Sequence, residues 1–112
     1  MSTDNTVRHY KGDTKKIIFK VTDVDTTESS FMEEDVDISN STFKVYFKSF
    51  ITQELVETTA DILHDNYIEY GVPSELPVGM YSMRVEETKQ DGTTTSYPRR
   101  PIRAATLRVI TL

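Results

Sequence analysis

The chain has 112 residues, a formal net charge of -5 and no cysteine, which fits one domain with one hydrophobic core. The absence of cysteine excludes disulfides and cysteine-ligated zinc sites. The negative charge argues against general nucleic-acid binding, and the apolar runs are too short for a transmembrane helix.

The N-terminal residues 1–6, MSTDNT, are small and polar. We expect them to form a flexible arm ahead of a single β-sandwich domain at 7–112. No apolar stretch typical of a signal peptide follows, so we expect no secretion signal.

Two segments, 15–22 and 41–50, alternate between apolar and polar residues, which predicts half-buried strands. Gly12-Asp13 marks a turn before the first of them. The residues expected to face inward are Ile17, Phe19 and Val21 in the first strand, and Phe43, Val45 and Phe47 in the second.

The intervening segment 23–37 holds seven acidic residues and no basic residue. We predict a long loop with a short strand at 36–38. Asp23, Asp25 and Thr27 begin like a calcium-binding loop, but Glu28 occupies the position at which the EF-hand requires glycine. A solvated acidic loop is therefore the preferred interpretation, and a looser calcium site is the alternative.

The segment 54–65 is ambiguous. Its apolar residues could line a short helix, whereas Thr58 and Thr59 favour a strand. We predict short strands at 54–57 and 61–63, followed by a strand at 66–70 that ends at Gly71.

The last third of the chain is expected to contain a loop, a β-hairpin and a final strand. Two prolines and a glycine predict the loop before 80–87, where Tyr81, Met83 and Val85 alternate with polar residues. Asp91-Gly92 is a hairpin signal that joins this strand to one at 93–97. Prolines at 98 and 101 interrupt strand pairing, and the final strand at 105–112 places Leu107 and Val109 on one face.

Many short strands with turn signals about every ten residues, and no long helix, are typical of a β-sandwich. We therefore predict an all-β fold, an immunoglobulin-like β-sandwich of seven to eight short antiparallel strands.

No catalytic pattern is recognised in the sequence. His9 and His64 do not show metal-ligand spacing, and no Ser/His/Asp arrangement or glycine-rich phosphate loop can be argued. We expect a protein that is not an enzyme and that has no metal or other cofactor.

Charge is unevenly distributed along the chain. Residues 97–112 contain arginines and no acid, whereas residues 21–43 contain acids and no base. The two segments could be ordinary solvated surface, or complementary patches that dock one copy on another or on a partner, since arginine suits carboxylate recognition. The candidate docking patch consists of Arg99, Arg100, Arg103, Arg108, Glu33, Glu34, Asp35 and Asp37.

Six aromatic residues suggest an alternative function. Core packing would account for most of them, and an aromatic strip that binds carbohydrate is the other interpretation. They are Tyr46, Phe50, Tyr67, Tyr70, Tyr81 and Tyr97.

Several motifs in chain order resemble those of a known family. The "KGDT" turn precedes the strand "KKIIFKVTD", and Asp37-Ile38-Ser39 leads the strand that contains "STFKVYFKS". Leu76-Pro77, Gly79 and Tyr81 then precede the Asp-Gly hairpin. Over residues 8–112 the chain resembles the small immunoglobulin-like domain of tailed-phage structural proteins, notably the N-terminal domain of the baseplate upper protein family.

The resemblance implies a structural role without catalytic residues. It implies a virion protein, assembled in the host cytoplasm, that docks in multiple copies on other virion proteins and on itself. The acidic segment 23–37 is longer than in the family pattern, and no stalk or receptor-binding part is visible. We therefore expect a tail or baseplate adaptor or a capsid-associated protein, with a host-adhesion module as the alternative.

Overall fold

The computed structural model describes residues 6–24, 33–35, 37–97 and 105–111. The fold is all-β, as predicted, and the described residues contain no helix. The ten strands are β1 (Thr6–Tyr10), β2 (Ile17–Lys20), β3 (Thr22–Val24), β4 (Glu33–Asp35), β5 (Thr42–Ser49), β6 (Leu55–His64), β7 (Tyr67–Tyr70), β8 (Gly79–Thr88), β9 (Thr94–Tyr97) and β10 (Ala105–Ile110).

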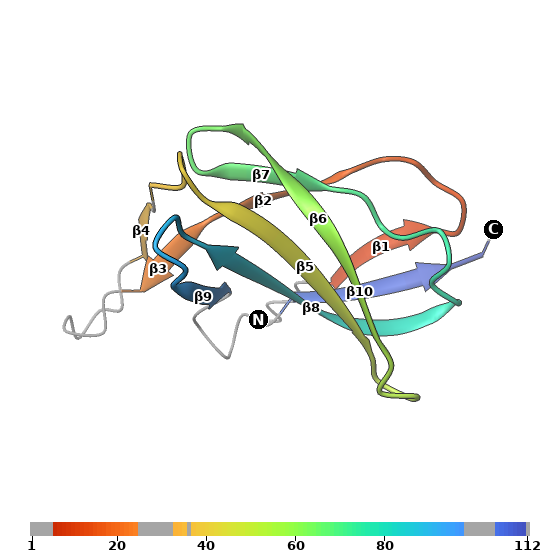
Figure 1. The fold of residues 1–112 in the computed structure, drawn as a ribbon. Helices are drawn as coiled ribbons and strands as arrows, with labels where there is room; N and C mark the ends of the chain where they lie inside the picture. Colours follow the sequence, from red (N-terminus) through yellow and green to blue (C-terminus); the bar gives the residue numbers. More distant parts are fainter. Residues whose placement is uncertain (1–5, 25–32, 36, 98–104, 112) are drawn as a thin grey trace.

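Eight of the strands form one sheet in the order β1-β10-β8-β5-β6-β7-β2, with β9 paired to β8. This sheet curls over so that its two halves face each other (Figure 1). The long strand β6 belongs to both halves, because Phe43 of β5 pairs with Ala60 and Glu69 of β7 pairs with Asp61. The resulting sandwich encloses the core on the inner face of the curled sheet.

The expected antiparallel pairing holds for every described ladder except one. Strand β1 runs parallel to β10, with Thr6 opposite Thr106 and Tyr10 opposite Ile110. The reason is that residues 11–16 carry the chain from one half of the sandwich to the other. Strand β1 therefore lies beside the last strand and does not form a hairpin with β2.

The predicted alternation accounts for most of the core. Phe43, Val45 and Phe47 of β5 are buried, and so are Tyr81, Met83 and Val85 of β8 and Leu107 and Val109 of β10. The rings of Phe47 and Tyr70 meet edge to face across the interior, with their centroids 6.2 Å apart. This contact between β5 and β7 ties the two halves of the sheet together.

The strand prediction is wrong in several details. The described residues form ten strands instead of seven to eight, and the strand expected at 15–22 is divided between β2 in the eight-stranded sheet and β3 in a separate two-stranded sheet. The segment 54–65 contains neither a helix nor two short strands, but the single ten-residue strand β6. The short strand expected at 36–38 lies at Glu33–Asp35. Ile38 instead reaches the core from a turn, in which Ser41 N–H donates to the Ile38 carbonyl.

A tyrosine near the start of β8 holds the segment that precedes this strand. The Tyr81 hydroxyl donates a 2.6 Å hydrogen bond to the carbonyl of Pro77, four residues upstream. A hydrogen bond from a tyrosine to the backbone a few residues upstream also occurs at strand corners of other β-sandwiches. Here it fixes the segment 71–78, which crosses from β7 to β8.

The acidic segment contains a small sheet of its own. Strands β3 and β4 pair antiparallel with each other and are not part of the eight-stranded sheet. Figure 1 shows them at the left of the view, whereas β1 lies at the right.

Candidate functional site

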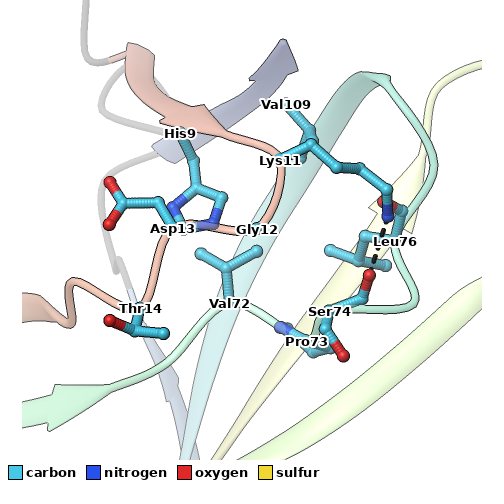
Figure 2. A pocket seen from close by; sticks show the side chains of 10 residues that line it. All are labelled: His9, Lys11, Gly12, Asp13, Thr14, Val72, Pro73, Ser74, Leu76 and Val109. Atoms are coloured by element: carbon cyan, nitrogen blue, oxygen red, sulfur yellow. Dashed lines mark hydrogen bonds between the residues drawn. The ribbon is translucent and has the colours of Figure 1, made fainter. Parts of the chain in front are cut away.

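A cavity of about 150 Å³ lies between the turn after β1 and the segment that follows β7 (Figure 2). It combines polar groups from the turn with an apolar wall from the crossing segment and from β10. The lining residues are His9, Lys11, Gly12, Asp13, Thr14, Val72, Pro73, Ser74, Leu76 and Val109.

Lys11 closes one side of this cavity. Its ammonium group donates hydrogen bonds of 2.7 Å to the carbonyls of both Ser74 and Leu76. The turn is possible because Gly12 adopts a positive φ of 90°. Lys11 therefore fastens the turn to the crossing segment.

His9 and Asp13 are the other titratable groups of the cavity. His9 is buried on the inner side of β1, where it lies in register with Val109. Asp13 accepts a 3.0 Å hydrogen bond from the backbone of Lys15. Among the described residues, no hydrogen bond joins His9 to Asp13, Thr14 or Ser74, so the cavity shows no assembled nucleophile and base.

The described members of the predicted docking patch do not meet within one chain. Arg99, Arg100 and Arg103 lie outside the described residues. Arg108 is exposed on β10, while Glu33, Glu34 and Asp35 form β4 in the separate small sheet. Any contact between the basic and acidic parts described here would have to join two molecules.

Asp37, the last member of the patch, is an exposed residue at the end of the acidic segment. Its Oδ1 accepts a 3.1 Å hydrogen bond from the Ser39 backbone. Hydrogen bonds from the backbone and side chain of Ser39 lower the pKa of the Asp37 carboxyl below its usual value. The group is therefore a stable anion at neutral pH.

The structure adds a basic residue that sequence reasoning missed. Arg8 of β1 lies in register with Arg108 of β10, and both residues are exposed. Their neighbours His9 and Val109 are buried, so the alternation of the strands places both arginines on the outer face. The sequence gives no local signal for this pair, because the two strands are about a hundred positions apart.

A second missed feature is a group of exposed apolar residues, here called the apolar tip. Phe50 and Ile51 lie in the turn after β5, Leu55 begins β6, and Val78 precedes β8. Their exposed fractions are 52%, 86%, 61% and 52%, respectively. A 3.1 Å hydrogen bond from Phe50 N–H to the Met80 carbonyl joins the two segments.

The turn that carries the apolar tip is well ordered by hydrogen bonds. The Ser49 hydroxyl accepts from the backbones of Ile51 and Thr52 at 3.2 Å, and the Ser49 carbonyl accepts from Gln53 N–H at 3.1 Å. Gln53 has a positive φ of 63°. These bonds hold the turn that carries Phe50 and Ile51 at the end of the projecting β5–β6 hairpin (Figure 1).

The aromatic residues do not form a continuous surface strip. Tyr70, Tyr81 and Tyr97 are buried, and burial raises the pKa of Tyr70 to about 12. Tyr46 and Tyr67 are half-buried, and Phe50 belongs to the apolar tip. Core packing thus accounts for half of the six residues, and the structure does not favour an aromatic sugar-binding surface.

Glu87 is a buried acid at the inner face of β8. The Ser41 hydroxyl donates to its Oε2 at 2.5 Å, and the Tyr97 hydroxyl donates to its Oε1 at 2.9 Å. These bonds join the start of β5, strand β8 and strand β9. Glu87 is therefore part of the internal structure, and it has no exposed surface on which to bind a ligand.

In the described part of the chain, no three acidic or histidine side chains are grouped so that they could hold a metal ion. His64 is exposed, with its Nδ1 3.5 Å from Asp65. Asp25, Thr27 and Glu28, of the calcium-loop alternative, lie outside the described residues. Nor does this part contain a helix long and apolar enough to cross a lipid bilayer.

No family model and no curated protein matches the sequence.

Proposed function

We propose that this chain is a non-enzymatic structural protein of a tailed-phage particle that docks in multiple copies on other particle proteins. Two lines of evidence support the proposal: the chain-order resemblance given by the sequence, and an exposed surface suited to protein contact. On this proposal the chain is assembled in the host cytoplasm and acts within the virion.

The observation that carries the proposal is the apolar tip. Soluble proteins rarely gather large apolar side chains on one exposed surface unless it contacts something. Ile51 is 86% exposed and projects from a hydrogen-bonded turn. Burying such a residue against a partner contributes about 25 cal/mol of binding free energy per Å² of apolar area. Because hydrogen bonds already hold the turn, binding does not also have to order a flexible loop.

Docking in several copies would compensate for the small size of this surface. Four side chains form the tip, which is fewer than a standard protein interface contains on each side. When several copies bind one particle together, their contacts act jointly, and total affinity exceeds that of any single contact. A small sandwich domain is suited to such repeated use.

The test compares two variants that add the same charge to the same turn. Ile51→Asp places a charge in the apolar tip, whereas Thr52→Asp alters the exposed polar residue beside it. Each chain is tagged and produced during particle assembly, and gradient-purified particles are assayed by quantitative mass spectrometry. We expect wild-type and Thr52→Asp chains at several copies per particle, and a loss of at least about tenfold for Ile51→Asp, since a few central residues carry most of the binding energy of such contacts.

Two results would contradict the proposal. Absence of the wild-type chain from purified particles would remove the virion role. Incorporation of Ile51→Asp at the wild-type copy number would show that the apolar tip is not the docking surface.

A further inference from the structure

We propose that the chain also binds itself, through the arginine pair Arg8 and Arg108 on one copy and the acidic strands β3 and β4 of a second copy. This inference deepens the proposed function, on which it rests, by naming a partner for the charged surfaces. The partner is another molecule of the same chain.

The arginine pair is electrostatically unfavourable in an isolated chain. The parallel ladder sets Arg8 directly beside Arg108 on adjacent strands, at the edge of the main sheet. Like charges in such positions destabilise a sheet. Within the part of the chain that the structure describes, neither arginine forms an ion pair with an acid. An acidic partner bound between them would remove the repulsion.

The small sheet is formed by residues of the opposite charge. Its register sets Asp23 opposite Glu34, with Asp35 and Glu33 as the next residues along β4. No lysine or arginine occurs between residues 21 and 43. The two ladders are therefore complementary in sign, and each has two like charges in register. Arginine is the suitable base, since its planar group can bind carboxylates through two hydrogen bonds.

The contact cannot form within one molecule as it is folded here. Strands β3 and β4 lie at one side of the molecule and β1 at the other (Figure 1). Each copy therefore offers one basic and one acidic surface. Copies joined head to tail in this way form a closed ring or an open filament, or a two-fold dimer if both contacts form between the same pair.

The charge of the chain also favours a protein partner over nucleic acid. A polyanion would meet a chain whose formal net charge is -5. A second copy instead presents its most acidic segment to the arginines, while its other residues need not approach them. The remaining negative charge of the two copies then lies away from the contact.

The experiment uses two double charge reversals that remove one surface each. Arg8→Glu with Arg108→Glu removes the basic surface, and Asp23→Arg with Glu34→Arg removes the acidic surface. Sedimentation velocity of the full chain is measured from about 0.05 to 1 M salt, over which the Debye length falls to about 3 Å. We expect oligomers of the wild-type chain that dissociate as salt rises, and monomers of either variant alone at every salt concentration.

Mixing the two variants gives the decisive result. The first variant keeps the acidic surface and the second keeps the arginine pair, so one native contact can form between them. The reversed surfaces, glutamates on the first variant and arginines on the second, are also complementary, so an equal mixture can restore both contacts. We expect the mixture to form oligomers again, and these oligomers to dissociate at high salt. Lys15→Glu with Lys48→Glu reverses two exposed lysines elsewhere, and should retain wild-type association.

Several outcomes would overturn the inference. A wild-type chain that is monomeric at every salt concentration would do so, as would variants that associate like the wild type or a mixture that stays monomeric. Circular dichroism confirms the fold of each variant, and Arg8→Gln with Arg108→Gln replaces the first pair if it fails. A wild-type chain that is incorporated into particles but does not self-associate would reject this inference alone, whereas absence of the wild-type chain from particles would reject the proposed function.

Discussion

At the scale of single residues, Glu87 shows how a polar group can organise a small core. A buried carboxyl is tolerated only when its oxygens are hydrogen-bonded. Here Ser41 and Tyr97 each satisfy one oxygen, and they come from different parts of the chain. The arrangement selects one position of β9 on β8.

Tyr97→Phe tests this role. The substitution removes the 2.9 Å hydrogen bond and leaves Glu87 Oε1 without that donor inside the protein. We expect the free energy of unfolding to fall by about 1–3 kcal/mol, as measured by urea denaturation. Tyr10→Phe, at a tyrosine that is 44% exposed, is the control and should change stability little. Equal stability of the two variants would show that the hydroxyl contributes nothing.

Tyr70 links a second buried hydroxyl to alkaline stability. Burial raises its pKa from 10.0 to about 12 in the folded protein. The unfolded chain therefore releases this proton first as pH rises. The stability that Tyr70 contributes is complete below pH 10 and is lost as pH approaches 12.

Tyr70→Phe should remove this part of the pH dependence. Between pH 10 and 12 we expect the wild-type unfolding free energy to fall more steeply than that of the variant, by up to roughly 1 kcal/mol per pH unit. Urea denaturation at several pH values measures both slopes. Parallel slopes would mean that Tyr70 ionises as readily in the folded protein as in the unfolded chain.

At the scale of strands, β5 separates core from surface by simple alternation. Phe47 is fully buried, while its neighbour Lys48 is exposed on the other face. Phe47→Ala should lower the unfolding free energy by about 3–5 kcal/mol, because it leaves a cavity beside Tyr70.

Lys48→Ala is the matched control on the same strand, and should change stability by less than about 0.5 kcal/mol. Thermal or urea denaturation measures both variants. If Phe47→Ala were as stable as Lys48→Ala, the assignment of the two faces of β5 would be wrong.

Alternation predicted these strands well where one face is buried and the other exposed. It identified the inward residues of β5, β8 and β10, and Asp91-Gly92 correctly predicted the turn, in which Gly92 has a φ of 88°. It failed for β6, because the second half of that strand is exposed on both faces and lacks a buried stripe.

Pairing between distant strands could not be predicted in the same way. The parallel ladder of β1 with β10 depends on where the chain crosses between the halves of the sandwich. Gly12-Asp13 marks a turn within that crossing, but the turn signal does not show which strand lies beside β1. Arg8 was missed as a neighbour of Arg108 for this reason, and the burial of Glu87 depends likewise on the distant residue Ser41.

At the scale of the whole molecule, the candidate surfaces occupy different places. The apolar tip projects with the β5–β6 hairpin at the lower right of Figure 1, while β3 and β4 lie at the left. The molecule extends 43 Å along its longest axis. A copy could therefore hold an acidic contact at one side while its tip binds a different protein.

The parallel pairing of β1 with β10 also has a mechanical consequence. Because the two strands run in the same direction, a pull on the N-terminal end of β1 and the C-terminal end of β10 draws them past each other lengthwise. All five register positions, from Thr6 with Thr106 to Tyr10 with Ile110, then carry the load together. A hairpin pulled from its open end would instead separate one pair at a time. The described ends of this chain are thus joined in the geometry that best resists tension.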